Sequence, residues 1–342
     1  MKVLSNSLRF IITTVAIIIL SGCDPKSTTG NFTVEADSIY AKEADAFIAS
    51  GATKGQAAQT EAIRKAIAGD SESLNAIRNG RSKKDYVDGR VAVNDSLPNI
   101  RIYTPSGEKK RRPVLLYLHG GGWCFGSIKS CSRFCTELCA NADIVIAALD
   151  YRLAPENPYP SAINDCVDAI KYLSAHADEL GIDTTRISIG GDSSGGNLAI
   201  VSALKSENSI HSLLLFYPVT NVSKPYGESW QTYGEGYAND AEIMEAFTDA
   251  YIPQEQRAIG LVSPLNLNDD ELKRLPNTLL VAAERDVLYD QGKSFIHKLH
   301  DLKVPAQHIT INGSVHLFIT VPGQDAAFYK SVELAKDFLA IQ

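Results

Sequence analysis

The sequence predicts an α/β protein in which helices cover both faces of a mostly parallel sheet, and two observations favour this class. Short, largely apolar segments recur at residues 114–118, 144–149, 187–189, 213–217, 278–282 and 308–311. Continuous apolar runs of this length are typical of strands that are buried on both faces. Helical patterns separate most of these segments, at about residues 130–140, 162–180, 194–206 and 288–302, and another at 326–339 closes the chain. This alternation indicates one α/β domain.

Residues 34–85 precede that alternation and have a different, Ala-rich pattern. Apolar residues recur there at helical spacing, and Gly51 and Gly69 are expected to end helices. Residues 86–93 and 100–103 then indicate two strands of a hairpin, with its turn around Asn94 and Asp95. The α/β domain is therefore predicted to span residues 86–342.

The stretch 218–275 interrupts the alternation. It is rich in Gly, Tyr, Asn and Asp and has only a weak helical pattern, at 241–251. Insertions of this length are usually lids or substrate-binding elements. We expect a cap made from this insertion together with the N-terminal helices of residues 34–85.

The N-terminus has the features of an export signal, predicted over residues 1–22. Lys2 and Arg9 flank a region without acids, an apolar run covers residues 10–20, and Leu-Ser-Gly-Cys ends at Cys23. This ending resembles the lipobox of bacterial lipoproteins, which implies cleavage before Cys23 and a diacylglycerol on its thiol. Residues 23–33 would then be a tether. The prediction is an exported, membrane-anchored lipoprotein that faces the periplasm or the cell exterior; an ordinary signal peptide or an uncleaved anchor is the alternative.

The composition and net charge of the chain limit the kinds of partner that it is expected to bind. The chain has 342 residues, 44% of them hydrophobic, and a formal net charge of −7, so it should fold around a sizeable core and nucleic acid is not an expected partner. The basic cluster at residues 109–112 fits a solvated turn.

The cysteine pattern does not indicate a metal site. Cys131, Cys135 and Cys139 recur every four residues and should share one buried helix face. The chain has no Cys-x-x-Cys pair, which argues against bound metal. A disulfide that involves Cys124 or Cys166 stays open for an exported protein.

A nucleophile elbow is predicted at residues 191–195, Gly-Asp-Ser-Ser-Gly. This G-x-S-x-G motif follows a strand and begins a helix, and glycines on both sides allow the tight turn that exposes the Ser193 hydroxyl. The alternative is a Gly-rich turn without chemistry. A phosphate-binding loop is excluded because no Gly-Lys-Ser/Thr ending follows.

Three glycines, within the sequence His-Gly-Gly-Gly-Trp at residues 119–123, directly follow the strand at 114–118. Backbone N–H groups in this loop can point at the oxyanion of a tetrahedral intermediate, which side chains would obstruct. The predicted oxyanion hole comprises Gly120, Gly121, Gly122 and Ser194, with Gly121, Gly122 and Ser194 as the donors. A dinucleotide fingerprint is excluded because Phe125 stands where Gly or Ala is needed.

The general base and its orienting acid must follow in the order Ser, Asp or Glu, His. His316 is the base, because it alone among the histidines follows the last predicted strand. For the acid, the segment after the strand at 278–282 offers Glu284, Asp286 and Asp290. Asp286 lies in the loop that leaves this strand, whereas Asp290 lies at the turn into the next helix.

Together these motifs resemble the hormone-sensitive lipase family of α/β-hydrolases. The matching segments are His119 to Trp123, Tyr151 to Glu156 with Pro158 to Ala162, Gly191 to Gly196, Asp286 to Asp290, and His316 to Phe318. The resemblance implies an α/β-hydrolase fold, a triad of Ser193, Asp286 and His316, a cap, and small acyl groups. The chain departs from the family at Val287, where Pro is usual, and in its lipobox, because members are often intracellular.

The predicted function is a serine carboxylesterase that hydrolyses short-chain esters through an acyl-enzyme intermediate, without cofactor or metal. An acetylated carbohydrate is one suitable ester. An amide-directed serine hydrolase, such as a peptidase or formamidase, would use the same residues. A catalytically silent binding protein is the alternative outside enzymes. Asp150, Arg152 and Glu156 are expected to brace the oxyanion segment rather than to take part in the reaction.

Overall fold

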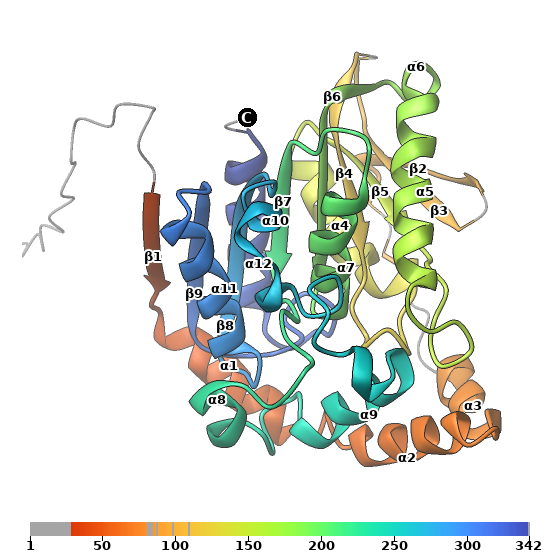
Figure 1. Cartoon of the computed structure of the whole chain (residues 1–342). Helices are drawn as coiled ribbons and strands as arrows, with labels where there is room; N and C mark the ends of the chain where they lie inside the picture. The colour runs from red at the N-terminus through yellow and green to blue at the C-terminus, as the bar shows by residue number, and fades with distance from the viewer. Residues whose placement is uncertain (1–28, 81–84, 87, 98, 109, 341–342) are drawn as a thin grey trace, which may run out of the picture.

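A nine-stranded sheet, in the order β1-β9-β8-β7-β6-β4-β5-β3-β2, forms the centre of the computed structural model. The structure describes residues 29–80, 85–86, 88–97, 99–108 and 110–340 (Figure 1). Within these ranges the strands are β1 (Thr29–Glu35), β2 (Val91–Leu97), β3 (Ile100–Pro105), β4 (Arg112–Leu118), β5 (Val145–Leu149), β6 (Ile182–Asp192), β7 (Ser212–Phe216), β8 (Asn277–Arg285) and β9 (Ala306–Val315).

The strands from β4 to β9, and β1 at one edge, all pair in parallel, and only β3 pairs antiparallel, with β2 and β5. The predicted apolar segments coincide with these parallel strands, except that Ile144 lies one residue before β5 and Tyr217 one residue after β7. Their side chains alternate between two cores: Leu116 and Leu118 of β4 belong to one, Leu115 and Tyr117 to the other. A parallel sheet buried on both faces explains why the sequence shows continuous apolar runs.

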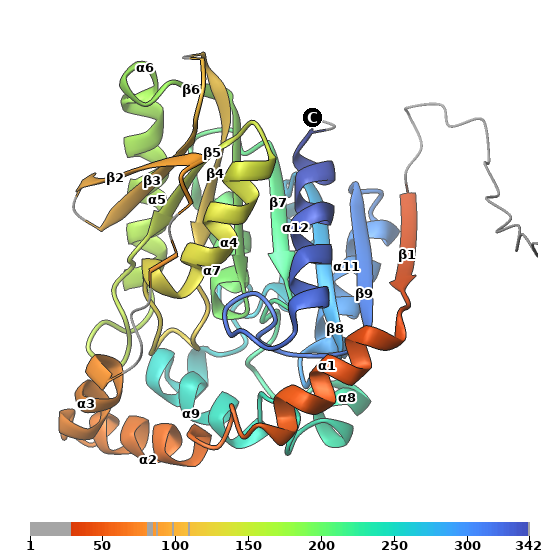
Figure 2. The ribbon, with the colours of Figure 1, turned by 180° about the vertical axis from the view of Figure 1, so that it is seen from behind.

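Helices cover both faces of the sheet, as predicted. In the described residues they are α1 (Ser38–Ala49), α2 (Gln56–Ile67), α3 (Glu72–Gly80), α4 (Ile128–Asn141), α5 (Ser161–Ala175), α6 (Ala177–Leu180), α7 (Ser194–Lys205), α8 (Gly227–Thr232), α9 (Ala241–Tyr251), α10 (Asp269–Leu272), α11 (Tyr289–Asp301) and α12 (Asp325–Ala340), with short 3-10 turns at Gln254–Gln256 and Pro264–Asn266. Side chains of α5, α7 and α11 pack in one core, and those of α4 and α12 in the other. Figure 2 shows α4 and α12 together on the face opposite α5.

Two expectations about the N-terminal half need correction. Residues 29–33, expected as part of the tether, and residues 34–35, expected to begin the N-terminal helices, belong to β1, which pairs with β9 at the sheet edge. The sequence missed this strand because an edge strand needs few apolar residues. The strand expected at 86–93 begins at Val91, and Asn94 and Asp95, expected at the hairpin turn, lie inside it; its pairing with β3 shifts register between Asn94 and Leu97.

The insertion and the N-terminal helices meet beyond the carboxyl ends of the strands. Helix α2 packs against α9, and Arg64 of α2 forms an ion pair with Glu242 of α9 at 2.9 Å. Figure 1 shows α1, α2, α8 and α9 side by side at that end of the sheet. Segments separated by more than a hundred residues thus cover the same edge.

The cysteines of the described region are free and buried. Cys131, Cys135 and Cys139 lie in the core between α4 and the sheet, as their spacing predicted, and Cys124 and Cys166 form no disulfide. No helix among the described residues is long and apolar enough to span a bilayer. The predicted signal, the lipidation site Cys23 and residues 24–28 lie outside the described residues.

Candidate active site

Ser193 lies at a strained turn between β6 and α7. Its φ of 54° and ψ of −119° are rare for a residue with a side chain, and its N–H donates to the carbonyl oxygen of Phe216 at 2.9 Å. A Cβ on Gly195 would lie 2.0 Å from the carbonyl oxygen of Leu118, and one on Gly191 would lie 2.4 Å from the same atom. The flanking glycines are therefore required by close backbone packing. This geometry has the form of a nucleophile elbow.

His316 and Asp286 form a buried pair at the same edge of the sheet. Nδ1 of His316 lies 2.5 Å from Oδ2 of Asp286, and both side chains are at most 2% exposed. Asp286 follows β8, His316 follows β9 and Ser193 follows β6, and these strands run parallel. Their carboxyl ends therefore bring the three residues to one edge.

The geometry separates the three acids that the sequence left open. Only Asp286 contacts His316 among them. Glu284 accepts a hydrogen bond from the N–H of Gly313 at 2.6 Å, and Asp290 accepts one from the N–H of Ser229 at 2.8 Å. Asp290 thus holds helix α8 of the insertion. Asp286 is the partner of His316 even though Val287 follows it where Pro was expected.

Gln324 fixes the backbone on both sides of the His316 position, and no sequence motif indicates this role. Its Oε1 accepts from the N–H of Val315 at 3.0 Å, and its Nε2 donates to the carbonyl oxygens of Val315 and His316 at 3.1 and 3.0 Å. Gln324 is itself buried. An amide that satisfies both neighbouring peptide groups holds this loop without entering the site.

The loop after β4 approaches its surroundings too closely for side chains. Gly121 and Gly122 have φ values of 119° and 61°. A Cβ on Gly121 would lie 2.4 Å from the carbonyl oxygen of Phe125, and one on Gly122 would lie 2.1 Å from the ring of Phe247 in α9. Within the described chain, no hydrogen bond engages the N–H of Gly121 or Gly122. Both donors are therefore available, together with the N–H of Ser194 at the start of α7.

Gly120 differs from its neighbours, which corrects its inclusion in the predicted oxyanion hole. Its N–H donates to Oδ1 of Asp192 at 3.1 Å, so it is already satisfied. The Tyr117 hydroxyl donates to the same oxygen at 3.1 Å. Asp192 is buried, and this burial raises the pKa of its carboxyl to about 6, although the hydrogen bonds from Tyr117 and Gly120 oppose the shift.

The His119 side chain is held within the loop after β4 by its neighbours and is not available for catalysis. Its ring stacks on Tyr151 with 4.3 Å between centroids, and its Nδ1 lies 2.8 Å from the carbonyl oxygen of Gly120. The Tyr151 hydroxyl donates to the carbonyl oxygen of His119 at 2.6 Å. Burial lowers the pKa of His119, which keeps its imidazole neutral.

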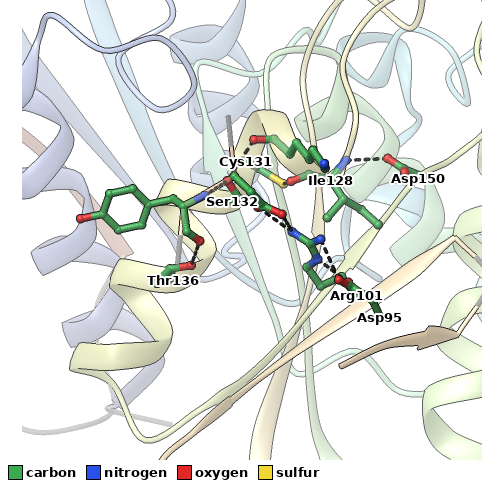
Figure 3. Close-up of polar contacts among 10 residues, drawn as sticks. Asp95, Arg101, Ile128, Cys131, Ser132, Thr136 and Asp150 are labelled. Atoms are coloured by element: carbon green, nitrogen blue, oxygen red, sulfur yellow. Dashed lines mark hydrogen bonds and ion pairs between the residues drawn. The ribbon is translucent and has the colours of Figure 1, made fainter. Parts of the chain in front are cut away.

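The expected brace of the oxyanion segment is present in part. Asp150 accepts a hydrogen bond from the N–H of Ile128 at 2.5 Å, at the start of α4 (Figure 3). Glu156 acts through Arg78, which pairs with it at 2.8 Å and donates to the carbonyl oxygen of Cys124 at 2.9 Å. Arg152 instead forms an ion pair with Asp165 of α5 and does not reach the loop.

The described residues contain no cluster of His, Cys, Asp or Glu that could hold a metal ion. The arrangement that remains is a buried Asp–His pair, a strained serine and free N–H groups at one sheet edge. These are the parts needed for nucleophilic acyl transfer.

Comparison with known proteins agrees with this fold. A family model for the alpha/beta hydrolase fold matches residues 115–320. An arylesterase of Saccharolobus solfataricus is 33% identical over 241 residues, which are 69% of this chain and 77% of that protein. An ethyl acetate hydrolase of Pseudomonas putida is 36% identical over 231 residues, or 64% of this chain and 71% of that protein.

Among solved structures, a thermostable esterase from Pseudomonas putida ECU1011 is similar, with a TM-score of 0.77 and 25% identity. The match covers 90% of this chain and 98% of the esterase chain. The chain belongs to the α/β-hydrolase family, and within it to the carboxylesterase type, so the resemblance inferred from the motifs is confirmed at this level.

Proposed function

We propose that this protein is a serine carboxylesterase in which Ser193 is the nucleophile, His316 the general base and Asp286 the orienting acid. The observation that carries the proposal is the buried Asp286–His316 pair, 2.5 Å between Nδ1 and Oδ2, at the sheet edge where the strained Ser193 also lies. A buried carboxylate on Nδ1 fixes the tautomer that leaves Nε2 free to accept a proton.

The reaction is acyl transfer to water in two steps. The Ser193 oxygen attacks the ester carbonyl while His316 takes the hydroxyl proton. The N–H groups of Gly121, Gly122 and Ser194 donate to the oxyanion, and each such donor is worth on the order of 3 kcal/mol in the transition state. The C–O bond to the alcohol breaks as His316 returns the proton to it, and water then releases the acid by the same route.

We propose short acyl groups as substrates. Phe247 of α9 packs directly on Gly122, and Trp123 stacks face to face on Tyr251 with 4.4 Å between centroids. These aromatic contacts restrict the space beside the candidate oxyanion donors. An ethyl acetate hydrolase and an arylesterase among the relatives support small esters. A sugar acetate fits the same requirement for a short acyl group.

The proposed location is a membrane surface outside the cytoplasm, through a lipid on Cys23. The support is the charged N-terminus, the apolar run at residues 10–20 and the Leu-Ser-Gly-Cys ending. Replacing Cys23 with Ala should abolish lipid labelling and release the protein from the membrane fraction. Continued acyl labelling of the variant would contradict the proposal.

The substrate proposal is tested with the detergent-solubilised full chain on p-nitrophenyl esters from acetate to laurate and on the matching anilides. We expect kcat/KM to peak at acyl chains of about two to six carbons, because a closed pocket gains roughly 0.8 kcal/mol per buried methylene only until it is full. Activity confined to the anilides would indicate an amide hydrolase. Binding without turnover of either series would indicate a silent binding protein.

A further inference from the structure

Tyr217 follows β7, a strand that lies between β6 and β8 and carries none of the proposed triad. The end of β7 is nevertheless bonded to both neighbours. Ser193 donates its N–H to the carbonyl oxygen of Phe216 at 2.9 Å, and Tyr217 donates its own N–H to the carbonyl oxygen of Val281 at 2.8 Å. This position is therefore fixed relative to the strands that precede Ser193 and Asp286.

The side chain of Tyr217 contacts the segment that follows β9. Its ring lies against the imidazole of His316, with 4.2 Å between centroids and 49° between planes. Its hydroxyl accepts a hydrogen bond from the N–H of Ile319 at 3.1 Å, and Phe318 packs edge-on against the ring at 4.7 Å. One buried side chain thus contacts the imidazole and also holds the loop that follows it.

The backbone of Tyr217 is unusual for a residue of this size. Its φ is 34°, in the region that favours glycine. An aromatic that only filled the core could occupy an ordinary strand conformation at no such cost. Strained residues of this kind persist where the surrounding structure demands one particular side-chain placement, often at functional sites.

We infer that Tyr217 is a positioning residue for His316. Its ring limits rotation of the imidazole, and its bond to Ile319 fixes the loop, so that Nδ1 stays on Asp286 and Nε2 stays free to accept a proton. The inference rests on the proposed function, because it matters only if His316 transfers the proton.

Two variants separate the contributions of ring and hydroxyl. Tyr217→Phe keeps the ring and loses the bond to Ile319, so we expect kcat to fall about fivefold with KM unchanged. Tyr217→Leu also frees the imidazole, so we expect kcat to fall on the order of 10- to 100-fold with KM within twofold of the parent. The far-downfield proton resonance of the Asp286–His316 hydrogen bond should persist in the Phe variant and broaden or vanish in the Leu variant.

Tyr103→Leu is the matched control, since Tyr103 is fully buried in the same core as Tyr217 but belongs to β3, away from the triad. It should lower the melting temperature while kcat per folded molecule and the downfield resonance stay at the parental level. Parental kcat in both Tyr217 variants, or a loss of kcat that only follows the unfolded fraction, would overturn the inference. Parental activity of Ser193→Ala would instead refute the proposed function itself.

Discussion

The N–H of Gly120 donates a hydrogen bond to the Asp192 carboxylate, at 3.1 Å from Oδ1. This contact joins the loop of the candidate oxyanion donors to the residue directly before Ser193. Gly120 lies so close that a Cβ there would stand 2.3 Å from Oδ2 of Asp192. The position of the donors is therefore set relative to the nucleophile by a buried carboxyl group.

This buried carboxyl group should reduce stability at neutral pH. Its pKa is raised from 3.8 to about 6 in the folded protein, so folding disfavours the charged form. The contribution of the neutral Asp192 carboxyl to the free energy of unfolding is fully present below about pH 4 and is lost as pH rises through 6. The side chain introduced by Asp192→Asn stays neutral at every pH. The free energy of unfolding of the variant minus that of the parent should therefore be roughly 2 to 3 kcal/mol larger at pH 8 than at pH 4.

Urea denaturation of parent and variant at both pH values measures this gain. The comparison at pH 4, where the Asp192 carboxyl is neutral in the folded protein, gives most of the cost of the amide itself. A difference between the two proteins that does not change with pH would contradict a raised pKa at Asp192.

Ser193→Ala should lower kcat at least 10³-fold, because the nucleophile is lost. The change removes one oxygen from a residue whose backbone bonds to Phe216 and Val219 remain. The melting temperature should therefore stay within a few degrees. Ester hydrolysis within tenfold of the parent, measured on a short-chain p-nitrophenyl ester, would show that another residue attacks.

Asp286→Asn and Asp290→Asn should have different effects. The first places an amide on Nδ1 of His316 and favours the wrong tautomer, which can cost roughly 10⁴-fold in kcat. The second weakens the charged acceptor for the Ser229 N–H in α8, so we expect KM to rise while kcat stays within tenfold. Steady-state kinetics decide between them, and a crippled Asp290→Asn enzyme would reverse the assignment.

Gly122→Ala should inactivate the enzyme through two causes, a φ of 61° and a collision with the Phe247 ring. Gly236→Ala is the matched control, because its φ is 82° and a Cβ there meets no atom within 4 Å. It should cost about 1 kcal/mol of stability and little activity. The double change Gly122→Ala with Phe247→Ala should recover part of kcat, and no recovery would mean that backbone strain alone is responsible.

Sequence reasoning identified the parts of the molecule that local rules govern. The parallel strands, the turn at Ser193 and the glycines of the loop after β4 depend on apolar runs and on backbone crowding, which residue types reveal directly. The choice of Asp286 over Asp290 needed the family resemblance, since both positions suit a carboxylate after a strand.

What sequence reasoning missed depends on contacts between distant segments. Tyr217 is one apolar-looking residue at the end of a buried strand, and nothing nearby in the chain indicates that His316 lies against it. Gly120 resembles Gly121 and Gly122 in sequence, and only the buried Asp192 makes it different. Strand β1 has exposed residues such as Val34 and little pattern of its own.

The direction of β1 determines how the active-site edge of the sheet would be oriented relative to a membrane to which Cys23 is anchored. Because β1 runs parallel to β9, its first residue stands at the amino edge of the sheet, opposite the edge of Ser193. Only five residues separate Cys23 from Thr29, so the chain between these two residues reaches at most about 20 Å. The seven residues of β1 alone span about 23 Å, and the cap adds roughly another helix diameter. Efficient hydrolysis of vesicle-embedded acyl esters by the lipidated chain would contradict this orientation. A lipid on Cys23 would hold the enzyme with the amino edge of its sheet toward the bilayer and Ser193 on the far side, so that its substrates would be dissolved esters rather than the lipids of the membrane that carries it.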